Sequence, residues 1–303
     1  APTVRQAIFD RSCSSTTGLA RRAGAAATLF ASVSRDSARP TGARRVRNES
    51  DAVDKYDRHM IAPPAELNRM RRHLRAADPV LAQLLRAAGR FTLEPRLAHT
   101  PFWSLARAIA NQQLNGTAAA TILARFVALY PGHEFPAPRQ VLATDDLTLR
   151  GVGFSFAKVA ALKDLAEKTE TGVVPSTRSL VTMADSEIIE RLTQVRGVGR
   201  WTVEMLLMFQ LGRPDVFPAD DFGIQNGFRL AYGIRAMPTP RALADYALRW
   251  APYRTMAAWY LWRAVDLDKL GKLPTPPLRT RIKTVKPKPR LKRRGAICIT
   301  VPP

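Results

Sequence analysis

Two adjacent aspartates, Asp220 and Asp221, are the residues of this sequence best suited to chemistry. They follow the apolar segment Val216–Pro218, where neighbouring carboxylates cost free energy unless one caps a helix and the other has a task. The sequence predicts that Asp220 caps a helix beginning at Asp221. The carboxylate that does not cap is then available for chemistry. The alternative interpretation is that both aspartates only cap.

A glycine pair, Gly197 and Gly199, lies upstream of the aspartates between two predicted helices. Glycines let a chain turn sharply and approach another backbone closely. The second helix then directs unpaired N–H groups and its positive dipole end at the turn, which suits a phosphate. Arg196 and Arg200 flank the pair, so the segment is a candidate anchor for the DNA backbone. A plain turn between helices is the alternative.

Four segments, taken together and in order, resemble a known family. They are Ala108–Ala120, Gly197–Thr202, Phe217–Asp221 and Trp250–Thr255. They are similar to segments of the helix-hairpin-helix DNA glycosylase superfamily, and within it to the 3-methyladenine (alkylbase) DNA glycosylase II type. The resemblance covers residues 64–270.

The resemblance implies a base-excision-repair enzyme that hydrolyses the N-glycosidic bond of alkylated purines, such as 3-methyladenine and 7-methylguanine, and leaves an abasic site. Asp221 is then the catalytic residue, which stabilises positive charge on the sugar and takes a proton from water. Trp201 stands where bifunctional relatives carry a nucleophilic Lys, so no lyase step is expected. Two alternatives remain open: a glycosylase of this superfamily for a deaminated or mismatched base, and a non-enzymatic helix-hairpin-helix DNA-binding protein.

The resemblance also implies the residues that hold the flipped base. Trp201 and Tyr253 are expected to stack on the cationic base. Met205 occupies a position that is tyrosine in some relatives, which predicts a more open pocket. Gln113 or Leu114 is expected to fill the gap that the flipped base leaves in the duplex. The remaining tryptophans outside the four segments are interpreted as core: Trp103, Trp259 and Trp262.

Apolar residues at three- and four-residue steps predict helices throughout the middle of the chain, and strand-like alternation is nearly absent. The fold class is therefore all-α, with one domain over residues 64–270. Gly151 and Gly153, before Lys158, are better explained as a simple turn between helices than as a second DNA contact. Pro131, Pro136 and Pro138 indicate a loop. The expected helices cover 65–75, 79–88, 102–130 with a break at 115–117, 145–150, 155–170, 185–194, 201–211, 221–232, 239–250 and 253–268.

Most of the net charge of +22 lies in the two ends of the 303-residue chain. Residues 1–47 hold nine Arg against two Asp, residues 271–303 hold ten Lys or Arg and no acid, and the middle is only +5. Residues 1–60 are predicted to be a disordered Arg/Ser/Ala-rich segment and 271–303 a flexible basic tail. A polyanionic partner and a pair of solvated ends both fit this charge distribution.

The composition also limits cofactors, partners and location. Cys13 and Cys298 cannot form a disulfide framework or a metal cluster, and no histidine spacing fits a metal, so no cofactor is expected to be required. The resemblance allows a structural monovalent cation at the hairpin.

No apolar run approaches the roughly 18 residues of a membrane span. The expected partner is double-stranded DNA containing alkylated bases, bound by a monomer inside the cell, in a bacterial cytoplasm or nucleoid. Residues 1–50 also fit an organellar transit segment, a mispredicted start or a DNA-binding arm.

Overall fold

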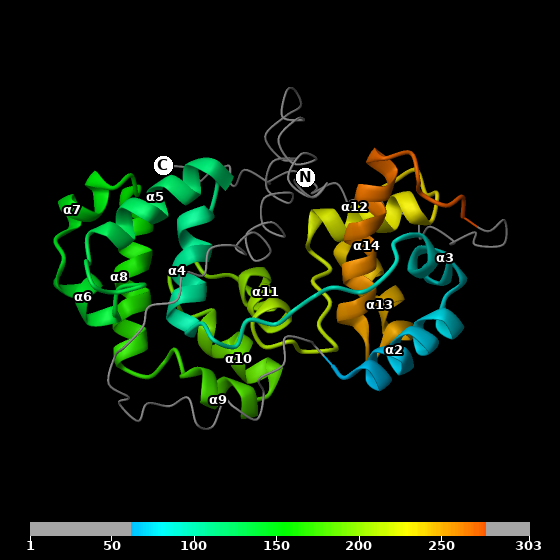
Figure 1. The fold of residues 1–303 in the computed structure, drawn as a ribbon, viewed down its shortest axis with the longest axis horizontal. Helices are drawn as coiled ribbons and strands as arrows, with labels where there is room; N and C mark the ends of the chain where they lie inside the picture. Colours follow the sequence, from blue (N-terminus) through cyan, green and yellow to red (C-terminus); the bar gives the residue numbers. More distant parts are fainter. Residues whose placement is uncertain (1–61, 115, 277–303) are drawn as a thin grey trace, which may run out of the picture.

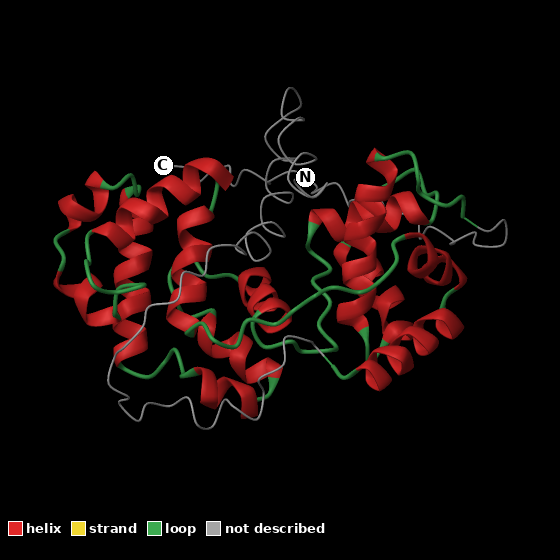
Figure 2. Ribbon diagram, viewed as in Figure 1, coloured by secondary structure: helices red, strands yellow, loops and turns green. Residues whose placement is uncertain are grey.

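The computed structural model describes residues 62–114 and 116–276, and within these residues every regular element is helical (Figure 2). The predicted N-terminal segment and most of the predicted basic tail lie outside the described residues. The helices are α2 (Pro64–Ala77), α3 (Pro79–Ala87), α4 (Pro101–Asn111), α5 (Gly116–Ala128), α6 (Pro138–Ala143), α7 (Asp146–Gly151), α8 (Phe156–Glu170), α9 (Thr177–Thr182), α10 (Asp185–Leu192), α11 (Arg200–Phe209), α12 (Phe222–Ala231), α13 (Pro240–Ala247), the 3-10 helix η3 (Leu248–Trp250) and α14 (Arg254–Lys269).

The helices form two lobes (Figure 1). One lobe contains α4 to α11, in which α8 packs against α4 and α6. The other combines α2 and α3 with α12 to α14, so the start and the end of the folded chain share a lobe. The segment between α3 and α4 crosses from one lobe to the other, and the segment between α11 and α12 crosses back (Figure 1). Any site that combines α11 with α12 therefore lies between the lobes.

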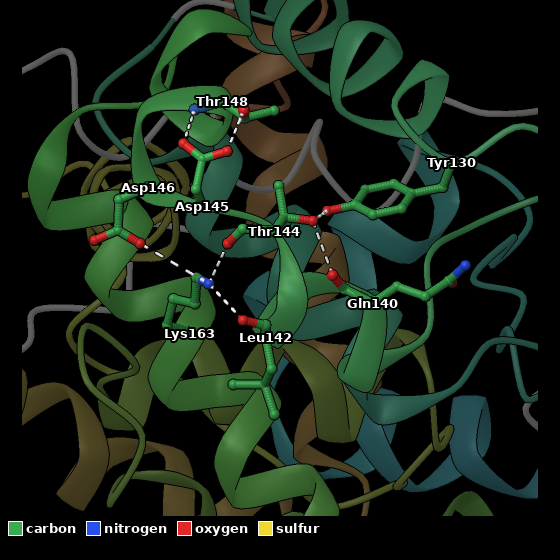
Figure 3. A network of polar contacts seen from close by, with 8 residues as sticks. All are labelled: Tyr130, Gln140, Leu142, Thr144, Asp145, Asp146, Thr148 and Lys163. Atoms are coloured by element: carbon green, nitrogen blue, oxygen red, sulfur yellow. Dashed lines mark hydrogen bonds and ion pairs between the residues drawn. The ribbon is translucent and has the colours of Figure 1, made fainter.

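The predicted helices are confirmed with small shifts at their ends. The structure adds two short helices that the sequence did not indicate: α6, which begins at Pro138 of the predicted loop, and α9. The last turn of each receives a cation from a distant part of the chain. Lys163 of α8 donates to the carbonyl oxygens of Leu142 and Thr144 at the end of α6 (Figure 3). Arg213 donates to three carbonyl oxygens at the end of α9. Cations at a helix C-terminus satisfy its unpaired carbonyls. Because both caps are long-range, the local sequence does not reveal them.

A glycine allows α12 and α14 to touch along their backbones. A Cβ atom placed on Gly227 of α12 would lie 1.9 Å from the carbonyl oxygen of Leu261 on α14. Only a residue without a side chain permits this approach. The contact fixes the spacing of the two helices whose ends and faces reach the site described below.

The N-terminal helices are tied to this lobe by a buried carboxylate. Asp78 caps α3 and accepts hydrogen bonds from the hydroxyls of Tyr232 (2.6 Å) and Tyr246 (3.2 Å) and from Nε1 of Trp250 (3.2 Å). The packed chain continues past α14, because Leu273 lies against the core and Pro276 lies near Gly233. The first residues of the predicted basic tail are therefore part of the folded domain.

Candidate active site

Asp221 is the buried carboxylate at the start of α12. Its Oδ1 accepts the backbone N–H of Ile224 at 2.8 Å, so Asp221 itself is the N-cap, and its side chain is almost fully buried. The prediction that Asp220 is the cap is wrong: α12 begins one residue later than expected, and Asp220 is exposed. One aspartate thus both ends the turn and carries the buried charge.

Two indole rings from different lobes hold the carboxylate of Asp221. Nε1 of Trp201 on α11 donates to Oδ2 at 3.0 Å. Nε1 of Trp262 on α14 donates to Oδ1 at 2.8 Å. The interpretation of Trp262 as a core residue is therefore incomplete. Its place on α14 gives no sign of this contact, because a tryptophan within a helix is usually a packing residue.

The protonation of Asp221 is set by opposing effects. Burial raises the pKa of the carboxyl above its ordinary value, and the N–H groups of Trp262, Ile224 and Trp201 partly offset that rise. Desolvation disfavours the charged form, whereas hydrogen bonds to the charged form favour it. The donors therefore matter for keeping an ionised carboxylate in a place from which water is excluded.

The structure does not join the other two predicted base-contacting residues to Asp221. Met205 lies fully buried in the core, and its contact with the base stays a prediction. The position is covered because the inner face of α11 packs into the core between the helices around it. Tyr253 precedes α14 and contacts α2, where its hydroxyl donates to Glu66 at 3.1 Å and its ring meets His73 edge-on.

The glycine pair forms the predicted turn between α10 and α11. Gly197 has a φ of +77°, which favours glycine, and Gly199 begins α11 without a side-chain cap. Both glycines and the flanking Arg196 and Arg200 are exposed. The geometry suits an anion, because the first N–H groups of a helix point outward from such a turn. Arg200 is also paired with Glu204 at 2.9 Å.

The predicted gap-filling segment lies beside this turn. Gln113 is exposed with a φ of +61°, the one positive value among the described non-glycine residues, while Leu114 is half-buried. The neighbouring Gln112 donates from Nε2 to the carbonyl oxygen of Gly197 at 2.7 Å. The segment is therefore attached to the hairpin, a contact between distant residues that no local pattern indicates.

The turn at Gly151 and Gly153 connects α7 to α8, in agreement with its interpretation as an interhelix turn. Lys158, beyond it, donates to the buried carbonyl oxygen of Ala110 at 2.7 Å. Its ammonium is thus used to hold the end of α4. The predicted DNA-backbone residues and the catalytic candidate come from the helix pair α10–α11 and from α12.

Known proteins share both the sequence and the fold. The model of the HhH-GPD superfamily of base excision DNA repair proteins matches residues 106–252, which include the hairpin and Asp221. DNA-3-methyladenine glycosylase 1 of Schizosaccharomyces pombe is 39% identical over 196 residues, covering 64% of this chain and 86% of that protein. The alkylbase DNA glycosidase-like protein mag2 of the same organism is 34% identical over 212 residues, covering 70% of this chain and all of that protein.

Solved structures agree. The S. pombe 3-methyladenine DNA glycosylase in complex with abasic DNA superposes with a TM-score of 0.60 at 38% identity, covering 68% of this chain and 100% of that one. A DNA-3-methyladenine glycosidase from Bacillus halodurans gives a TM-score of 0.60 at 31% identity, covering 70% of this chain and 94% of that one. The chain belongs to the HhH-GPD superfamily of base excision DNA repair proteins, among the glycosylases of the 3-methyladenine type.

Proposed function

We propose that this protein excises alkylated purines, such as 3-methyladenine and 7-methylguanine, from double-stranded DNA and leaves abasic sites. The observation that carries the proposal is the buried Asp221, whose carboxylate is oriented by two indoles beside the helix-hairpin-helix turn. The names of the relatives at 39% and 34% identity point to the same class of substrate.

The chemistry asks little of the protein beyond a well-placed negative charge. An alkylated purine of this kind is cationic, so its bond to the sugar can break without a general acid, and the bonding electrons leave with the base. The sugar becomes positively charged, which a nearby carboxylate stabilises. Water then adds to C1′, and its proton passes to Asp221 or to solvent. Asp221 is the catalytic residue of this proposal.

The proposal includes no lyase step. Trp201, beside Asp221, stands where the bifunctional relatives carry their Lys, and an indole nitrogen cannot form a Schiff base with the sugar. The product is therefore an intact strand with an abasic site. We propose that Trp201 also contacts the flipped base, and that Tyr253 approaches it only if the segment around it moves, because its present contacts are with α2.

DNA binding is assigned to the hairpin and the neighbouring segment. The N–H groups at Gly197 and Gly199, with Arg196 and Arg200, receive the phosphate backbone, and Gln113 or Leu114 fills the gap left by the base. A monomer suffices, and the proposed chemistry needs no cofactor; a monovalent cation at the hairpin would add only to phosphate binding. No helix of the described residues is long and apolar enough to cross a membrane. We propose a location wherever the cell keeps DNA.

The proposal is tested with DNA methylated to contain 3-methyladenine and 7-methylguanine. The parent protein, Asp221→Asn and Asp220→Asn are compared for release of free bases and for strand breaks. Asparagine keeps the N-cap, so Asp221→Asn should fold and bind abasic DNA while excision falls at least about a hundredfold. Asp220→Asn is the matched control, because this neighbouring aspartate is exposed, and it should retain activity.

Three outcomes would count against the proposal. Near-normal excision by Asp221→Asn would remove the catalytic assignment. Strand breaks at the excised sites would contradict the absence of a lyase step. Release of a deaminated or mismatched base, but no methylated one, would move the substrate to another lesion.

A further inference from the structure

Trp262 lies outside every segment that pointed to function, yet it touches the proposed catalytic group. It is on α14, beyond the end of the matched family segment, and its Nε1 lies 2.8 Å from Oδ1 of Asp221. We propose that Trp262, with the space provided by Gly223, is a positioning residue that holds Oδ1 of Asp221 and so leaves acceptor capacity on Oδ2 for the reacting sugar. This inference rests on the proposed role of Asp221.

The hydrogen bonds to the carboxylate are unevenly divided. Oδ1 accepts from Trp262 and from the N–H of Ile224, both at 2.8 Å, while Oδ2 accepts from Trp201 at 3.0 Å. The backbone N–H of Gly223 also interacts with this carboxylate. An ionised carboxylate oxygen can accept about two hydrogen bonds. Both acceptor positions of Oδ1 are therefore filled by hydrogen bonds within the protein. Oδ2 keeps more capacity to interact with the positive charge that develops on the sugar.

Asp78 provides an internal comparison in the same molecule. It is also buried, also an N-cap, and also held by aromatic donors. In Asp78, however, Oδ2 accepts from Tyr232, Tyr246 and Trp250, and Oδ1 accepts from two backbone N–H groups. Both oxygens of Asp78 are fully used, which is typical of a structural carboxylate. At Asp221 the hydrogen bonds are divided differently between the two oxygens, because Trp262 donates to Oδ1.

Gly223 has no side chain, and this leaves room for the hydrogen bond between Trp262 and Asp221. A Cβ atom there would lie 2.9 Å from Cδ1 and 3.0 Å from Nε1 of Trp262, and 3.0 Å from Oδ1 of Asp221. Those distances are shorter than real Cβ contacts tolerate without movement. An alanine at this position would therefore press on both partners of the hydrogen bond.

The indole is held in place independently of its hydrogen bond. The ring of Phe209, on α11, stacks on Trp262 with centroids 5.8 Å apart and an angle of 27°. The neighbouring Leu261 is the residue whose carbonyl meets Gly227. Because Phe209 stacks on the ring, a phenylalanine at position 262 can keep the stacking and lose only the donor.

The test measures single-turnover excision of 7-methylguanine against pH for the parent, Trp262→Phe and Trp259→Phe. Trp259 is the matched control, since it lies on the same helix and packs on Phe91 and Tyr260. For Trp262→Phe we expect about a tenfold lower rate, the order expected for one hydrogen bond to a charged group. Trp259→Phe should keep the parent rate.

The acidic limb of the pH profile separates positioning from packing. Excision requires ionised Asp221, so the rate falls as pH drops through its pKa. The Trp262 N–H is among the groups that lower this pKa, so its loss raises the pKa and moves the limb to higher pH. Gly223→Ala, which keeps the indole, should move the limb in the same direction. Its affinity for abasic DNA should remain that of the parent, which also reports correct folding.

The outcomes are distinct. A rate that falls equally at all pH values in Trp262→Phe, with the limb unmoved, would show a packing role only and overturn the inference. An unchanged rate and profile in both Trp262→Phe and Gly223→Ala would also overturn it, while leaving Asp221→Asn as the test of the proposed function. Full activity of Asp221→Asn would instead remove the proposed function itself.

Discussion

Replacing Gly227 by alanine tests how closely α12 and α14 must pack to build the site. The new Cβ atom would lie 1.9 Å from the carbonyl oxygen of Leu261 and 2.7 Å from its carbon. Ordinary contact begins at 3.4 Å, so the backbones must separate by about 1.5 Å, the difference between 3.4 Å and 1.9 Å. The obstacle is backbone, which cannot rotate away as a side chain can.

The energetic cost follows from two opposing effects. Overpacking costs typically about 1–3 kcal/mol, and an immovable backbone places this case at the upper end. Alanine in a helix interior recovers about 1 kcal/mol relative to glycine. The net destabilisation is about 2 kcal/mol. For a domain of this size that corresponds to a melting temperature lower by about 4–8 °C.

Thermal unfolding followed by circular dichroism measures the effect. Gly151→Ala is the matched control, because Gly151 ends α7 and a Cβ atom placed on it would have no neighbouring atom within 4 Å, so the stability of this variant should be unchanged or slightly higher. Excision by Gly227→Ala should also fall, since Asp221 and Trp262 sit on the two separated helices. A melting temperature at or above that of the parent would refute the reasoning.

Two further predictions concern the buried anchor and the basic end of the chain. Asp78→Asn places an amide among donors that need an acceptor, so the free energy of unfolding should fall by about 2–3 kcal/mol in urea titration. Burial and the charge of Asp78 raise the pKa of Tyr246 to about 12. Without that charge, Tyr246 should ionise at lower pH in alkaline absorbance titration. An unchanged stability would mean that the three aromatic donors do not depend on the charge. Removing residues 277–303 should make DNA affinity less sensitive to salt, because nine Lys or Arg are lost from that end, and an unchanged slope would show that these residues do not contact phosphate.

The sequence by itself determined the helical class, the hairpin and the catalytic candidate. Helical periodicity and the turn at Gly197 and Gly199 depend on neighbouring residues, so they can be read locally. The spacing between Trp201 and Asp221 could be recognised because both belong to segments that the family shares, and the structure joins them by a hydrogen bond.

Tertiary structure alone decided the remaining features of the site. The cap is Asp221 rather than Asp220 because α12 begins at Phe222, one residue later than the sequence indicated. Met205 is buried because α11 packs into the core between its neighbours, although its sequence position suggested a pocket. The carbonyl oxygens at the ends of the short helices α6 and α9 are capped by Lys163 and Arg213 from other parts of the chain.

Trp262 shows the same physical reason most clearly. Its hydrogen bond to Asp221 joins residues 41 positions apart, and it depends on Gly223 and Gly227 leaving room for α14 against α12. A local pattern records which face of a helix is apolar, but not which atom of a distant helix that face meets. Local hydrogen bonds and periodicity therefore fixed the elements, whereas close packing between distant elements decided how the carboxylate is held.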